Sequence, residues 1–261
     1  MTLLKHELRR GRLSMLIWAA GLSFMLGICI LIYPEMAGQM EEMNAMFADM
    51  GNFTAAFGMD QLNFGEFKGY FGIECGNTLG MGGAIFAALL GISAISKEEK
   101  DHTAEFLLTH PISRTGVFCE KFLAIVIQII SLNGIVIVMT LSTTWIIGES
   151  LPFKETFYLF LTFTLLQLEI AGITFGISAF LKGNGIGIGL GYGLGMYLIN
   201  LIANLVEEAK FIKYITPFAY ADSASIYSKG FPEIKYILSG VVLTIAVLII
   251  AECHYKKKDI Q

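Results

Sequence analysis

Charged residues are scarce in this 261-residue chain. They make up 15% of it, against 55% hydrophobic residues and a mean hydropathy of +0.65. Soluble domains carry about 25% charged residues, so this chain has too few to cover its apolar surface. The net charge of -4 also lacks the basic excess that a nucleic-acid partner requires. These shortages exclude a soluble enzyme, a disordered chain and a nucleic-acid-binding protein, and they indicate a protein that crosses a membrane several times.

Residues and motifs that perform chemistry are equally few. All four histidines lie outside the long apolar runs, which counts against an intramembrane metalloprotease. The four cysteines form no CxxC pair, so neither a zinc site nor a disulfide framework is indicated. The sequence contains no G-x-S-x-G elbow and no phosphate-binding P-loop. We therefore expect no cofactor or metal on this chain, and any ATP that drives it must be bound by another polypeptide.

What the sequence does contain is six long apolar runs. A helix needs about 20 apolar residues to cross the hydrocarbon core, whereas the strands of a membrane β-barrel give weakly alternating segments of about ten. We therefore predict an all-α polytopic protein in which residues 1–261 form a single transmembrane domain. The expected spans are residues 13–32, 71–95, 122–147, 157–180, 185–205 and 236–251.

The distribution of Lys and Arg predicts the orientation of these spans. If the N-terminus is cytoplasmic, the inner segments hold twice as many Lys and Arg residues as the outer ones, in agreement with the positive-inside rule. Six spans then place both termini in the cytoplasm, and we expect the cell membrane as the location. If residues 1–12 are helical, their leucines and their basic residues lie on different sides of the helix. This pattern is typical of an interfacial helix or of a basic flanking segment.

The segment between the first two expected spans, residues 33–70, carries methionines at helical spacing. They are Met36, Met40, Met43, Met46 and Met50. Steps of three and four residues predict an amphipathic helix. Three roles stay open: packing against other outer loops or the leaflet surface, a flexible apolar surface for a substrate, and a copper-binding cluster.

Glycine recurs in the expected spans at intervals that favour close helix packing. Gly172 and Gly176 are four residues apart in the fourth span, and glycine occupies every second position from Gly183 to Gly195 in the fifth. Small residues at such spacing let two helices approach closely. A hinge in the fifth span is the alternative interpretation.

Two carboxylates fall inside expected spans. Glu74 lies near the outer end of the second, and Glu169 near the middle of the fourth, where a charge costs a few kcal/mol or more. We expect Glu169 to be protonated, exposed to a polar cavity or hydrogen-bonded to another span. Its candidate partners are Asn133, Thr140 and Asn200. Such residues either belong to a route or gate through the membrane, or form a polar contact between helices.

The most informative stretch follows the second expected span. From Lys97 to Arg114 it reads K-E-E-K-D-H-T-A-E-F-L-L-T-H-P-I-S-R. Its charged beginning leaves the membrane, and its middle predicts a short amphipathic helix that Pro111 ends. A short helix with an exposed apolar face either fits the groove of a partner protein or rests on lipid.

This stretch resembles the permease subunits of ABC-2 type transporters. In that family an acidic cluster follows the second span, then Thr-x-Glu, a leucine pair, Pro-x-Ser-Arg and a lysine at the start of the third span. The matching residues are Glu98, Glu99, Thr103, Glu105, Leu107, Leu108, Pro111, Ser113, Arg114 and Lys121. His102 departs from the pattern, since a glycine is common there. Weaker similarities are Thr216-Pro217-Phe218 before the last span and Lys257-Lys258-Asp259-Ile260 in the tail.

The resemblance implies a fold and a mechanism. It implies six transmembrane helices, an N-terminal interfacial helix and a cytoplasmic coupling helix within residues 97–114. Two permease chains, identical or related, would pair in the bilayer above two copies of a separate ATPase that binds ATP and Mg²⁺. Glu105, Phe106, Leu107 and Arg114 are the expected contacts with that ATPase.

Members of the family mostly export lipids, glycans, drugs or peptides, so the resemblance implies an exporter permease. Two alternatives stay open. One is a permease for immunity to, or sensing of, antimicrobial peptides, and the other is a membrane-embedded enzyme. For a transporter, the candidate polar residues of the substrate path or gate are Glu169, Glu74, Asn133 and Asn200.

Overall fold

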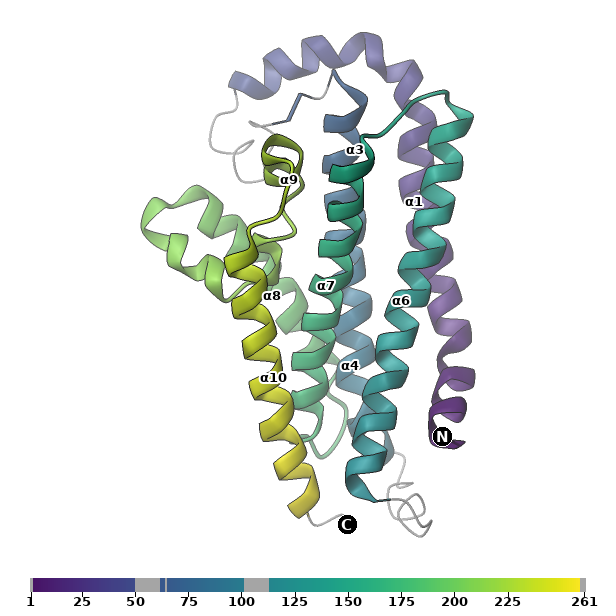
Figure 1. Ribbon diagram of the computed structural model, residues 1–261, viewed down its shortest axis with the longest axis vertical. Helices are drawn as coiled ribbons and strands as arrows, with labels where there is room; N and C mark the ends of the chain where they lie inside the picture. Colours follow the sequence, from purple (N-terminus) through teal and green to yellow (C-terminus); the bar gives the residue numbers. More distant parts are fainter. Residues whose placement is uncertain (1, 50–61, 64, 101–112, 259–261) are drawn as a thin grey trace.

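The computed structural model describes residues 2–49, 62–63, 65–100 and 113–258 (Figure 1). Within these ranges the chain is helical and contains no strand. Six segments are long and apolar enough to span a membrane, which confirms the predicted all-α fold with six such helices. They are Leu3–Gly38, Phe67–Lys97, Arg114–Ile146, Phe153–Ser178, Ile186–Leu205 and Ile234–Lys257.

The first helix, α1 (Thr2–Asp49), is longer than the expected span at both ends. The N-terminal residues, expected as an interfacial helix, continue into the span without a break. Toward its C-terminal end the helix turns and runs across the end of the bundle (Figure 1). Pro34 lies inside this helix, and proline favours a bend because it removes a backbone hydrogen bond and clashes with the preceding turn. Residues 36–49, which include the first four methionines, are thus helical as predicted.

The second span is assembled from three helical pieces. They are α3 (Phe67–Cys75), the π-helix η1 (Gly76–Gly82) and α4 (Gly83–Lys100). A π-helical turn widens the backbone by one residue, and such turns occur often at functional sites. The sequence predicts a single span over residues 71–95, because hydrophobic length does not distinguish an uninterrupted α-helix from one that contains a π-helical turn.

Helices α4 and α7 (Phe153–Ser178) form the centre of the bundle. Helix α1 packs on α6 (Arg114–Ile146), α8 (Ile186–Leu205) packs on α4, and α10 (Ile234–Lys257) packs on α7. Phe71, Phe163 and Phe175 are among the largest fully buried side chains. Helix α10 by contrast exposes a long apolar face, which suits contact with lipid.

Both termini lie at one end of the bundle, which we call the terminus-bearing end (Figure 1). At the opposite end, three short helices join α8 to α10. They are η2 (Glu207–Tyr214), η3 (Pro217–Ala219) and α9 (Ser223–Lys229). Helix α9 packs on α3 and ends at Gly230, whose φ of 76° favours glycine. This connection brings Tyr220 back into the bundle, where its side chain is buried.

The alternating glycines of α8 divide between two faces of the helix. A Cβ atom on Gly189 would lie 2.6 Å from a side-chain carbon of Ile92, and one on Gly193 would lie 3.3 Å from Ala88, so these glycines let α8 approach α4. Gly187, Gly191 and Gly195 face the other way, and no other part of the described chain lies within 4 Å of the position a Cβ would take. We call these three the open glycine face.

Candidate functional site

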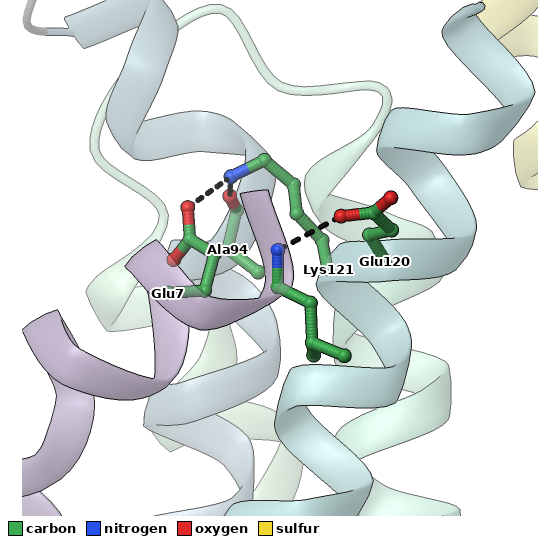
Figure 2. A network of polar contacts seen from close by, with 5 residues as sticks. Glu7, Ala94, Glu120 and Lys121 are labelled. Carbon is green, nitrogen blue, oxygen red and sulfur yellow. Dashed lines mark hydrogen bonds and ion pairs between the residues drawn. The ribbon is translucent and has the colours of Figure 1, made fainter. Parts of the chain in front are cut away.

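Polar contacts at the terminus-bearing end join three helices through one lysine. Lys121, on α6, is 2% exposed, and its ammonium binds Glu7 Oε1 of α1 at 3.0 Å and the Ala94 carbonyl of α4 at 2.8 Å (Figure 2). The residue pattern predicts Lys121 at the start of the third span, but α6 begins at Arg114, so the lysine lies two turns inside the helix. A buried ammonium requires such partners, because desolvation otherwise disfavours its charge.

A second contact between α1 and α6 lies beside this lysine. The Leu4 backbone N–H donates to Glu120 Oε2 at 2.8 Å (Figure 2). The first N–H groups of a helix lack partners within it, and the helix dipole favours a negative group there. Glu120 therefore caps α1 from a neighbouring helix, which fixes the N-terminal turn of α1 to the start of α6.

A cavity of about 270 Å³ lies between α1, α4 and α6 beside these contacts. Lys121, Glu7, Arg10 and Lys97 line it together with apolar residues of the three helices. Gly11 allows α1 to pass close to α6, because a Cβ there would lie 2.2 Å from Gln128 Oε1. The cavity thus adjoins the point at which the segment after α4 leaves the bundle.

Arg114 links the start of α6 to the end of α10. Its guanidinium donates to the Tyr255, Lys256 and Lys258 carbonyls at 3.3, 3.2 and 2.5 Å. Carbonyls at the end of a helix have no partner within it, and a cation there also matches the helix dipole. One arginine of the predicted coupling motif therefore caps the C-terminus of the last span.

Lys258 continues this connection to α7. Its ammonium donates to the Ala179 and Leu181 carbonyls at 3.0 and 2.7 Å, just after α7 ends. The α6–α10–α7 connection, from Arg114 through the end of α10 to Lys258, thus joins two motifs that the sequence analysis considered separately. Only the packing of the helices brings Arg114 and Lys258 together, because they are 144 residues apart in the sequence.

Most residues of the predicted coupling motif lie outside the described residues. They are Thr103, Glu105, Phe106, Leu107, Leu108 and Pro111. Glu98 and Glu99 lie in the last turn of α4, for which the backbone is described. Ser113 is the N-cap of α6 and accepts a hydrogen bond from the Gly116 backbone N–H at 3.1 Å.

Glu169 has a different partner from those the sequence analysis expected. The Tyr220 hydroxyl donates to its Oε2 at 2.9 Å, and both side chains are buried. Asn133 instead pairs with Gln167 across α6 and α7, with its Nδ2 2.7 Å from Gln167 Oε1. The expectation that Asn133, Thr140 or Asn200 would bind Glu169 was wrong, because the aromatic connection after α8 folds back and supplies the hydroxyl.

The other two intramembrane candidates lie elsewhere. Glu74 is half-buried on α3, just before the π-helix. Asn200 is buried on α8, and its Oδ1 has no partner among the described residues. A cavity of about 70 Å³ between η1, α8 and η3 is lined by Asn200 together with Asn77, Asn204 and Asp222. Glu169 and Asn200 thus line different cavities, and Glu74 lines neither of the two.

Sequence reasoning missed two functional candidates, Tyr220 and Glu7. The sequence pattern assigns no role to Tyr220, and the signal that could have drawn attention to it is the need of a buried carboxyl for a donor. Glu7 is the one acidic residue among the basic N-terminal residues, where a partner for a buried lysine could have been sought. Neither signal identifies the partner residue, because Tyr220–Glu169 and Glu7–Lys121 each join distant parts of the chain.

Comparison with known proteins agrees with the residue pattern. The sequence model of the family described as "ABC-2 family transporter protein" matches residues 1–260. No curated protein and no solved structure gives a significant match. The match covers nearly the whole chain, including the six spans, the Lys97–Arg114 segment and the basic tail. The chain therefore belongs to the ABC-2 family of transporter proteins, as a permease embedded in the membrane.

Proposed function

We propose that this chain is the permease subunit of an ATP-driven exporter and that a separate ATPase drives it from the terminus-bearing end. The α6–α10–α7 connection is the observation that supports this most directly. The coupling motif ends at Arg114, which binds the end of α10, and Lys258 binds the end of α7. A partner that displaces residues 97–114 would therefore move three spans together.

The Lys121 contacts would extend the same movement to α1 and α4. Lys121 ties α6 to α1 through Glu7 and to α4 through the Ala94 carbonyl. ATP and Mg²⁺ would be bound by the ATPase, two copies of which would serve a pair of permease chains. For energy to be transmitted, the coupling segment must make different contacts in the two nucleotide states.

The proposed orientation places the terminus-bearing end in the cytoplasm of a cell whose plasma membrane holds the permease. Support comes from the basic residues of this end, which include Arg9, Arg10 and the lysines that close α10. A cytoplasmic ATPase could then reach the coupling segment.

The open glycine face of α8 is the surface we propose for pairing with the second permease chain. Ladders of small residues four apart allow two membrane helices to pack closely, and Gly187, Gly191 and Gly195 have no neighbour in the described chain. The polar cavity around Asn200 lies on the same helix. That cavity lies on the inner face of α8, toward η1 and η3, so pairing through the open glycine face would leave it within each chain.

Replacing Gly191 with Trp is expected to prevent this pairing. The indole would hold the two helices apart, so two differently tagged copies should no longer co-purify from the membrane. Gly134→Trp on α6 is the matched control, because Gly134 also has no neighbour within 4 Å of its Cβ position. Retained co-purification in the Gly191 variant, at the level of the control, would exclude a homodimer through this face.

The docking assignment is tested by replacing Phe106 and Leu107 with Asp. Two carboxylates on the apolar face of the coupling helix cannot be buried in a groove without a large desolvation cost, so we expect the ATPase to be lost on purification. Phe153→Asp is the control, since Phe153 is 86% exposed at the opposite end of the bundle. Undiminished recovery of the ATPase with the double variant, properly inserted in the membrane, would refute docking at this segment.

A further inference from the structure

A cavity of about 250 Å³ lies between α6, α7 and α10 on the outer surface of the bundle. Helices α6 and α10 meet at the terminus-bearing end, where Arg114 binds α10, and diverge toward the opposite end with α7 between them (Figure 1). The walls are apolar side chains such as Leu165, Leu168 and Val241. We call this cavity the α7 groove.

Two residues that line the α7 groove each carry a buried side-chain oxygen without a hydrogen-bond partner among the described residues. The oxygens are Glu169 Oε1 and Thr244 Oγ1. Glu169 is only 5% exposed, and its other oxygen already accepts from Tyr220. Buried polar atoms nearly always have a hydrogen-bond partner in folded proteins. Two such oxygens without a partner, on residues that line the same cavity, therefore indicate a site for a polar group of a ligand.

The position of the groove limits what can reach it. It lies within the apolar part of α6, α7 and α10, and wall residues such as Val241 and Ile245 are 43% and 51% exposed at the surface of the bundle. A molecule that enters from this surface must be dissolved in the bilayer. The apolar walls suit an alkyl chain, while the two oxygens suit a hydrogen-bond donor at its end.

We propose that the α7 groove binds a membrane-dissolved amphiphile whose polar end is a single hydrogen-bond donor, a hydroxyl or an amine, held by Glu169 Oε1 and Thr244 Oγ1. The alkyl part packs between α6 and α10 against Leu165, Leu168 and Val241. The proposal does not depend on the proposed export function or on the ATPase, because the groove is formed within one chain.

Photolabelling in phosphatidylcholine nanodiscs tests this proposal, since phosphatidylcholine carries no hydrogen-bond donor. The probe is a long-chain fatty alcohol with a diazirine, and the labelled peptides are identified by mass spectrometry. We expect label on α6, α7 and α10 around the groove. 1-Dodecanol or dodecylamine should compete at least about tenfold better than dodecyl methyl ether, because the ether lacks a donor and leaves the two oxygens without a partner; tenfold corresponds to about 1.4 kcal/mol.

Two kinds of variant distinguish the contribution of the polar contact to binding from that of the apolar walls. Val241→Trp fills the groove and should abolish the labelling, whereas Ile249→Trp, on an exposed position of α10 outside the groove, should leave it unchanged. Glu169→Leu and Thr244→Val should each reduce the preference for the alcohol over the ether. The relative competition of alcohol and amine identifies which donor is preferred.

Three results would overturn the proposal. They are label spread evenly over the exposed helices, equal competition by the ether, and labelling that persists in the Val241→Trp variant. Each is measured on the permease alone, so none of them bears on whether an ATPase docks at residues 97–114.

Discussion

Replacement of Lys121 by Ala is expected to lower the free energy of unfolding by about 2–3 kcal/mol. The ammonium is 2% exposed and binds both Glu7 Oε1 and the Ala94 carbonyl, so its loss removes contacts with α1 and α4 at once. Breaking a buried pair by removing one partner costs about 3–5 kcal/mol, and we expect less here because the Glu7 side chain is 19% exposed and can be hydrated.

The melting temperature of the purified permease in detergent measures this effect. Lys256→Ala is the matched control, because Lys256 forms an exposed ion pair with Glu252 at 2.9 Å, and such pairs contribute at most about 1 kcal/mol. Exchanging the charges in a Glu7→Lys, Lys121→Glu variant should recover part of the loss. A melting temperature of the Lys121 variant equal to that of the control would show that the buried contact does not hold α1, α4 and α6 together.

Replacement of Gly240 by Leu is expected to destabilise the protein by about 2–4 kcal/mol. Helix α10 crosses Glu169 at this glycine, and a Cβ there would lie 2.0 Å from Glu169 Oε2. Either α10 must move away from α7, or Glu169 must turn and lose its bond to Tyr220. Both outcomes remove contacts in the interior of the bundle, where neighbouring atoms have little room to adjust.

A double variant identifies the cause of that loss. Truncating the clashing side chain in Gly240→Ala, Glu169→Ala should give a protein more stable than Gly240→Ala alone, because residues in direct contact are not additive. Gly134→Leu is the control, since that glycine has no neighbour within 4 Å and should tolerate a side chain on α6. Additive losses in the double variant, again followed as melting temperature, would argue against a direct clash between α10 and Glu169.

The terminus-bearing end shows how much of the structure the residue pattern predicts. The sequence predicts that residues 97–114 form a distinct motif between two spans, because charge, proline and amphipathic spacing are local properties. It does not predict that Arg114 caps α10 or that Lys258 caps α7. Those bonds depend on which helix ends lie side by side, and the sequence separation of Arg114 from Lys258 gives no indication of it.

The intramembrane carboxyl of Glu169 is a second case in which the sequence identifies a residue but not its partner. Sequence reasoning selected Glu169 correctly as a buried group that needs a partner, since the cost of burying a carboxyl is a property of the residue and its depth. The candidate partners, Asn133, Thr140 and Asn200, lie in the spans, whereas the donor is Tyr220 in the connection after α8. Nothing in the linear pattern distinguishes a tyrosine that folds back into the bundle from one that stays at the membrane interface.

The sequence by itself determined that this protein is a helical membrane protein with six apolar helices, and the pattern after the second span connected it with the ABC-2 family. Hydrophobic length alone decides whether a segment can cross a bilayer, because every span must satisfy its own backbone hydrogen bonds. Only the tertiary structure decided that α4 and α7 are central and which polar groups pair. Glu7 meets Lys121 across 114 residues and Tyr220 meets Glu169 across 51, because helix packing rather than chain proximity brings a donor to its acceptor.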